Sequence, residues 1–193
     1  MGKLFGKINR GIIVTVVVLV IVISYLVIHS AIQKSELPDI KEACVTYVQA
    51  DAEWHVLPEN LRNGQTNPAD SEIQKYADSL EPEVIAYYAD NATVRENAMA
   101  SVLMNLQVPL LQGRINTSFE NGNVKFGTIT FRDNTVTVDF TTQAATEYID
   151  IASGSTTPAR VSGIMNNQII LQKEGGEWKI IYASLSMSDT GGY

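Results

Sequence analysis

Charged side chains are absent from one long stretch near the start of the chain, Gly11–Ile28, with the sequence GIIVTVVVLVIVISYLVI. Extended to Ile32, the apolar stretch covers about 20 residues, and a helix of that length spans about 30 Å, the thickness of the hydrocarbon core of a bilayer. A strand in a protein core is much shorter. The pattern therefore predicts a transmembrane helix over residues 11–32 and makes the lipid bilayer a partner of the chain.

The charges on either side of this helix predict its orientation. Lys3, Lys7 and Arg10 precede it, whereas the first acidic residue is Glu36. The positive-inside rule then places a tail of residues 1–10 in the cytoplasm and the rest of the chain outside the plasma membrane, in an extracellular or periplasmic position. A cleaved signal peptide shares the basic start, but its apolar region is usually shorter and ends in a small-x-small site. We expect an uncleaved anchor, and either alternative exports the same domain.

A polar linker, residues 33–38, separates the anchor from a first amphipathic helix. Pro38 suits the first turn of a helix, and the helix is predicted from Ile40 to about His55 because its apolar residues recur every three or four positions. These residues are Ile40, Ala43, Cys44, Tyr47, Ala50 and Trp54.

Two more helices follow a loop rich in Pro, Asn and Gly. The second helix covers residues 71–88 and is either kinked or divided at Pro82, because proline clashes with the carbonyl four residues earlier. The third begins at the capping residue Asn91 and stops at Gly113. The predicted buried residues are Ile73, Tyr76, Ala77, Leu80, Val84, Tyr87 and Tyr88 in the second helix, and Met99, Val102, Leu103, Leu106 and Leu110 in the third.

After Gly113 the apolar residues alternate with polar ones, which is the period of a half-buried strand. Turns are expected at Asn121-Gly122, Asp133-Asn134 and Gly175-Gly176. The fold class is therefore α+β: about three helices packed on one face of a curved antiparallel sheet of four to six strands, in a domain of residues 39–188 before a tail of 189–193. The predicted strands are residues 114–120, 124–132, 135–141 with a continuation toward Ile151, 160–173 and 178–187.

Composition and charge exclude several classes of partner and site. All 21 acidic residues follow the apolar run, together with 11 of the 14 Lys and Arg, so the exported part is strongly acidic and nucleic acid is not expected as a partner. Two histidines and one cysteine cannot make an ordinary zinc site, and no calcium-binding D-x-D-x-D-G loop is present. We expect no cofactor and no metal. The single cysteine, Cys44, cannot form an internal disulfide.

The ending Gly175–Met187, GGEWKIIYASLSM, resembles the closing hairpin of nuclear-transport-factor-two-like domains, the cystatin-like or SnoaL-like cones. The resemblance implies a cone-like domain over residues 38–188. A cytoplasmic tail, one membrane span and an exported cone also look like the scaffold subunits of conjugation and type IV secretion machines. That second resemblance rests on architecture alone and implies assembly through the span and the cone, without catalysis.

Candidate chemistry lies on the first helix, where Tyr47, Asp51 and His55 are spaced four apart on one edge. Burial raises the pKa of a carboxylate, so Asp51 within the apolar stripe could serve as a general base. Tyr47 could donate a hydrogen bond to it, and His55 could relay a proton. Two other interpretations stay open: Asp51 and His55 face water, or Asp51 pairs with an arginine of the sheet, Arg114 or Arg160.

A partner interface is the other candidate site. The apolar strand segment Ile169, Ile170 and Leu171 is either an edge that pairs with another subunit or a segment buried on both faces. The leading function is therefore a single-pass scaffold or interaction protein that binds protein partners or forms a homo-oligomer. The alternative is a ligand-binding or enzymatic cone with a pocket around Tyr47, Asp51 and His55.

Overall fold

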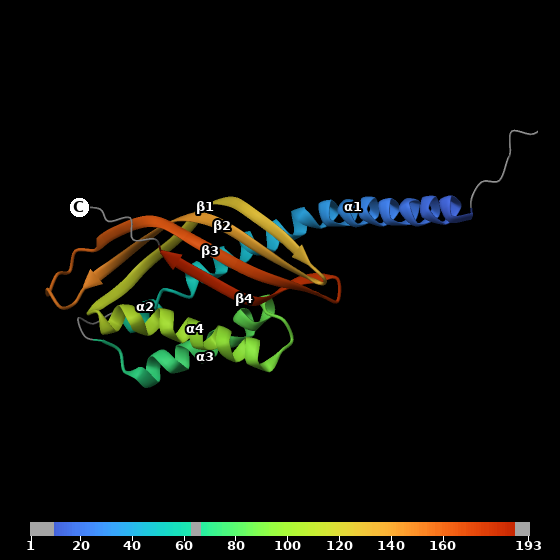
Figure 1. Cartoon of the computed structure of the whole chain (residues 1–193). Coiled ribbons are helices and arrows are strands. Elements are labelled where there is room, and N and C mark those ends of the chain that lie inside the picture. Colours follow the sequence, from blue (N-terminus) through green and yellow to red (C-terminus); the bar gives the residue numbers. More distant parts are fainter. Residues whose placement is uncertain (1–9, 63–66, 188–193) are drawn as a thin grey trace, which may run out of the picture. The chain divides into compact units, whose positions relative to one another are not determined.

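The computed structural model describes residues 10–62 and 67–187 of the 193-residue chain (Figure 1). The chain divides between Asp39 and Ile40 into two compact units. In the first unit, the residues that the structure describes belong to a single helix, α1 (Arg10–Glu53), which continues into the second unit. The second unit is an α+β domain.

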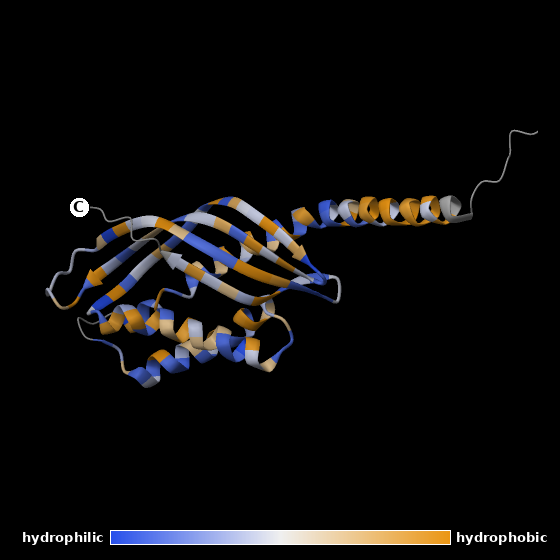
Figure 2. Cartoon of the chain, in the orientation of Figure 1, coloured by the Kyte–Doolittle hydropathy of each residue, from blue (hydrophilic) through white to orange (hydrophobic). Residues whose placement is uncertain are grey.

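The first part of α1 is mostly hydrophobic, with a few paler residues among the orange ones (Figure 2). From Val14 to Ile28 every side chain is exposed, with the leucines, isoleucines and valines between 49% and 63% accessible. Among the described residues, α1 alone is a helix long and apolar enough to cross a membrane, by length and composition. The predicted membrane helix is compatible with this finding.

Helix α1 does not break where the sequence predicted a linker, at residues 33–38, nor does a new helix begin at Pro38, which lies inside α1. The proline leaves the carbonyl of Lys34 without its helical donor. Pro38 is exposed, so water can bond that carbonyl, and most of the neighbouring residues are good helix formers. The Ser35 hydroxyl bonds back to the carbonyl of Ile32 at 2.7 Å.

The domain has helices packed on one face of a four-stranded antiparallel sheet, with strand order β1-β2-β3-β4 (Figure 1). This confirms the predicted α+β class and curved sheet. Along β2 the core-facing residues Val136, Val138 and Phe140 alternate with partly exposed polar ones. The remaining elements are α2 (Glu59–Arg62), α3 (Asp70–Tyr87), α4 (Ala92–Leu111), β1 (Arg114–Arg132), β2 (Thr135–Asp150), β3 (Ala159–Glu174) and β4 (Glu177–Met187).

The core joins the C-terminal part of α1 with α3, α4 and the sheet. Most residues of the predicted helical stripes are buried, and the others are half-buried against them. Pro82 lies inside α3 without ending it. Asn91 caps α4 as predicted, because its side chain accepts a hydrogen bond from the Val94 amide at 3.2 Å. The largest fully buried side chains are Trp54, Ile40, Ile73, Ile115, Ile169, Leu171 and Ile180.

The predicted hairpin turn at Asn121-Gly122 is wrong: β1 is one strand across this point. Its first half pairs with the second half of β2, and its second half with the first half of β2. Because β2 is long enough to pair with both halves, the chain bends at register irregularities instead of reversing. Asn123, with φ 52°, lies within one of them.

Gly113 ends α4 in a left-handed conformation, with φ +72°, and its carbonyl accepts the Ile151 amide at 2.8 Å. A Cβ there would lie 3.0 Å from the Cβ of Ala152, whereas Gly154, with φ +67°, has open space. Both Gly→Ala variants place alanine in the disfavoured region, but only Gly113→Ala also creates a clash. We expect urea unfolding to show Gly113→Ala less stable than Gly154→Ala by about 1 kcal/mol. Equal losses would contradict the close contact with Ala152.

Candidate functional site

The spacing of four residues brings Tyr47, Asp51 and His55 onto one face of α1, and that face is turned into the domain. Tyr47 is 3% exposed and Asp51 4%, and the side chain of His55 is 16% exposed. The sequence prediction that Asp51 lies within the apolar stripe is confirmed. The interpretation that Asp51 and His55 simply face water is wrong.

Asp51 is paired with His55 and not with an arginine. The Oδ2 atom of Asp51 lies 3.1 Å from Nε2 of His55, one helical turn later. Arg160 instead bonds Glu147 at 3.0 Å and Glu120 at 2.9 Å, on the surface. The proposed arginine partner for Asp51 is therefore wrong, because the sheet uses Arg160 for a cross-strand ion pair.

Arg114, the other arginine considered for Asp51, lies over the ring of Tyr148, with its guanidinium carbon 4.7 Å from the ring centroid. This is a cation–π arrangement at the start of β1. The sequence could not reveal it, because the register between β1 and β2 decides which side chains are neighbours.

His55 is held from three sides. Its ring stacks on Phe119 of β1, with centroids 4.4 Å apart and planes 13° apart. The side-chain amide of Asn105, on α4, lies 3.1 Å from the same Nε2 that contacts Asp51. A ring nitrogen that donates its proton to Asp51 has no lone pair with which to accept a hydrogen bond from Asn105. If Nε2 is the donor, the side-chain oxygen of Asn105 must therefore be the atom that faces it. The pair thereby links α1, α4 and β1.

Tyr47 does not complete a triad with Asp51 and His55. Its hydroxyl is hydrogen-bonded to the hydroxyl of Tyr88 at 2.8 Å, and its ring makes edge contacts with Trp54, Tyr87 and Tyr88. Burial, and then the charge of Asp51, raises the pKa of Tyr47 well above its usual value, and burial raises the pKa of Tyr88 to about 12. Both phenols keep their protons at neutral pH, so neither serves as a base.

The polar side chains around Asp51 form a buried network in which each has a hydrogen-bond partner. Trp54 also bonds outward, with Nε1 donating to Glu83 at 3.1 Å. The enclosing side chains leave Asp51 almost no accessible surface, and a general base must reach its substrate or a bridging water.

Among residues 10–62 and 67–187, no cluster of three or more His, Cys, Asp and Glu could hold a metal ion.

The predicted interface segment Ile169, Ile170 and Leu171 lies on β3, which is an inner strand. Ile169 and Leu171 are fully buried in the core, and Ile170 is half-buried on the other face. The edge interpretation is therefore wrong, because β2 and β4 occupy both sides of β3. The exposed edges of the sheet are β1 and β4.

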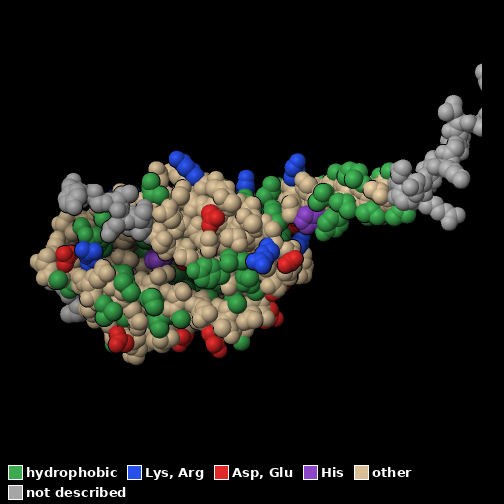
Figure 3. Space-filling view, in the orientation of Figure 1, with side chains coloured by type: hydrophobic (Ala, Val, Ile, Leu, Met, Phe, Trp, Pro, Cys, Tyr) green, Lys and Arg blue, Asp and Glu red, His purple; other side chains and the backbone are tan. Residues whose placement is uncertain are grey.

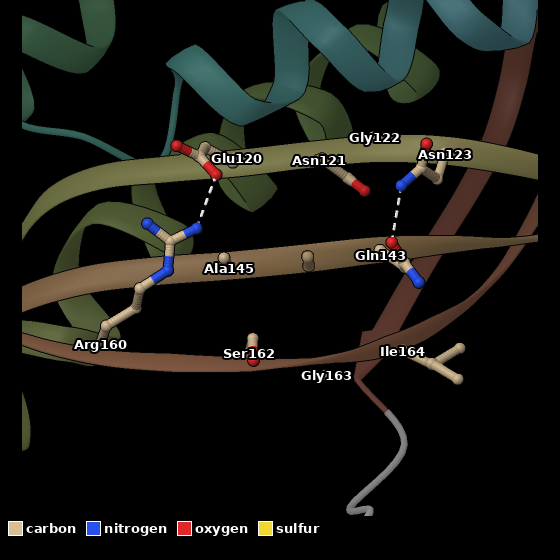
Figure 4. A pocket seen from close by; sticks show the side chains of 11 residues that line it. Glu120, Asn121, Gly122, Asn123, Gln143, Ala145, Arg160, Ser162, Gly163 and Ile164 are labelled. Atoms are coloured by element: carbon tan, nitrogen blue, oxygen red, sulfur yellow. Dashed lines mark hydrogen bonds and ion pairs between the residues drawn. The ribbon is translucent and has the colours of Figure 1, made fainter.

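The face of the sheet away from the helices carries a shallow groove that sequence reasoning missed (Figure 4). It has a volume of about 570 Å³ and crosses β1, β2 and β3. One end holds the Arg160 ion pairs with Glu120 and Glu147, and the other holds a 2.6 Å hydrogen bond from Asn123 to Gln143. Exposed ion pairs of this kind contribute little stability. The alternation along the strands was the available signal, since these residues occupy its polar positions.

Comparison with known proteins assigns no family to the chain. No protein-family profile matches it, and no curated protein matches it. Among solved structures, the crystal structure of the intermembrane space region of chloroplast protein ARC6 is similar, with a TM-score of 0.37 and 13% sequence identity over 61% of this chain and 91% of that chain. A likeness of this degree supports no statement about activity.

Proposed function

We propose that this chain is a single-pass membrane protein whose domain works by contact, as a scaffold that binds protein partners or associates with itself. The observation that carries the proposal is the first part of α1. An uninterrupted apolar surface around a whole helix is stable in lipid and not in water. Hydrophobic side chains cover this part of α1 in the space-filling view (Figure 3).

We propose that the anchor stays uncleaved, and the continuity of α1 is the support for this version. The apolar run and the first core helix are one continuous helix, α1. Ile40, Cys44 and Val48 of the same helix are fully buried in the domain core. Cleavage near Ser30 would cut through the helix, whereas an anchor uses it intact.

In the proposed orientation, α1 crosses the plasma membrane, the N-terminus lies in the cytoplasm and the domain lies on the outer side. The support is the charge distribution: three basic residues precede the span and no acidic ones do. The acidic surface of the domain favours a solvated position over one against an anionic lipid leaflet.

Contact is proposed instead of catalysis because the candidate catalytic residues are engaged with one another. Asp51 is enclosed and bonded to His55, and Tyr47 is bonded to Tyr88. We also propose that the domain is a nuclear-transport-factor-two-like cone, which helices on one face of a curved antiparallel sheet support. A secretion or conjugation complex is the setting that the resemblance in architecture suggests.

Cysteine labelling in intact cells tests the proposed topology. Thr156 is exposed on the loop between β2 and β3, and burial raises the pKa of the native Cys44 thiol to about 12, so Cys44 gives little background. We expect a membrane-impermeant maleimide to label Thr156→Cys in intact cells and Lys3→Cys only after permeabilisation. The reverse pattern would contradict the orientation, and labelling of neither in cells would contradict export.

A further inference from the structure

The two edges of the sheet differ in how they are protected against pairing with another chain. Natural edge strands carry charges, bulges or a covering segment, because unpaired N–H and C=O groups form a template for a further strand. Edge strand β1 has three register irregularities and several charged residues. Edge strand β4 has a single register irregularity, at Ile181, which has no partner residue on β3. Beyond it, Tyr182–Met187, YASLSM, contains no charged residue, no proline and no glycine.

Only the beginning of the β4 edge is covered by the chain itself. The amide of Ala89 donates to the carbonyl of Ile180 at 2.9 Å, and Tyr88 and Ile180 form a parallel bridge. Lys179 Nζ donates to the carbonyl of Ala86 at 3.0 Å. Beyond Ile180, no strand among the described residues pairs with the outer side of β4. We call the regular uncovered segment between the bulge at Ile181 and the last residue of β4, Tyr182–Ser186, the open edge.

We propose that the open edge pairs antiparallel with the open edge of a second copy, with a two-fold axis at Ser184, so that the two sheets become one sheet of eight strands. The proposal rests on the proposed function of self-association and names its interface. Opposite residues of an antiparallel pair lie on the same face of the sheet. With the helices of both copies on one face, the axis must therefore pass at a residue, and Ser184 is the midpoint of the open edge.

The side chains of the open edge are complementary to themselves in this register. Ala183 faces the partner's Leu185, and Tyr182 faces the partner's Ser186, so a small residue lies opposite a large one in each pair. At the axis, Ser184 faces Ser184 of the partner. A charge at an axis position would face an identical charge, which destabilises a pair, and the open edge has none. This is the pattern of an isologous interface.

The anchor strengthens such an association. Two copies held in one membrane meet at a higher effective concentration than two free domains, so a short ladder suffices for a dimer. Tyr182, Ser184 and Ser186 also line a shallow groove of about 640 Å³ on the face away from the helices. The proposed pairing would continue that groove across the two-fold axis.

Disulfide trapping in membranes containing the full-length chain tests the register. In a Ser184→Cys variant, the two introduced Cβ atoms face one another at about 5 Å, close to the distance that a disulfide needs. Gln168, opposite Ser184 on the inner strand β3, gives the matched control, because Gln168→Cys lies about 4.8 Å further from the axis in each copy. We expect oxidation to give at least about ten times more dimer from Ser184→Cys than from Gln168→Cys. Equal trapping, or no trapping at position 184, would overturn the proposal.

A charge variant separates this proposal from the proposed function. Ser184→Lys places two lysines opposite one another, and we expect the dimer to dissociate at least about ten times more readily than with Gln168→Lys, by native mass in nanodiscs. If the unmodified chain assembles but neither variant at position 184 has its effect, the interface is wrong and self-association stands. If the unmodified chain is monomeric and binds no partner, the proposed function falls and the interface falls with it.

Discussion

Replacing Val18, Val22 and Leu26 together by arginine is expected to release the full-length chain from the membrane fraction. These side chains are 53%, 49% and 59% exposed on the apolar part of α1. Each arginine near the centre of a membrane helix costs about 2.5–3.5 kcal/mol for insertion, so three of them remove most of the driving force. The measurement is the fraction of protein that resists alkaline carbonate extraction.

The matched control places three arginines on the same helix outside the apolar run, as Glu42→Arg, Thr46→Arg and Gln49→Arg. These positions are exposed on the domain part of α1, and the triple variant should stay in the membrane like the unmodified chain. Retention of both triple variants would show that the first part of α1 is not the anchor.

The second large effect is expected at the buried pair of Asp51 and His55. His55→Ala leaves the enclosed side chain of Asp51 without its hydrogen-bond partner, and an unsatisfied buried polar group costs about 1–3 kcal/mol, more for a charged one. We expect His55→Ala to lose about 1–3 kcal/mol of unfolding free energy, and not more, because the His55 side chain keeps 16% exposure. In a double-mutant cycle with Asp51→Ala, the coupling between the two residues should be about 1–3 kcal/mol.

The control for this cycle is Gln74 and Asp78 on α3, which have the same spacing and a 2.8 Å hydrogen bond but lie exposed. Their coupling should stay below about 0.5 kcal/mol. Urea unfolding of the full-length protein in detergent gives both numbers. Additive losses at Asp51 and His55 would mean that the two side chains do not stabilise the fold as a pair.

Local patterns predicted those parts of the fold in which burial follows a simple period. The stripe of α1 from Ile40 to Trp54 and the alternation of Val136, Val138 and Phe140 gave the correct elements, because each has one face in a single core. Pro38 misled the prediction of the helix start, since an exposed proline costs a helix one hydrogen bond and need not end it.

The errors in the sheet have a different origin. Asn121-Gly122 is a strong turn signal, but the length of β2 lets the chain pair through it. The order of the strands decides that Ile169 lies inside the sheet and that β4 is an edge, and order is not readable from strand sequences alone. The same holds for the site: burial of Asp51 follows from its helix, whereas its enclosure by Phe119 and Asn105 depends on β1 and α4.

The central claim is that this membrane-anchored domain works by contact, and the most direct test is the mass of the full-length chain captured from native membranes in nanodiscs. The chain alone has a mass of 21.2 kDa. The account predicts particles that hold two or more copies, or one copy with a co-purifying protein. Particles that hold a single copy and no other protein, at the expression level of the native membrane, would contradict it.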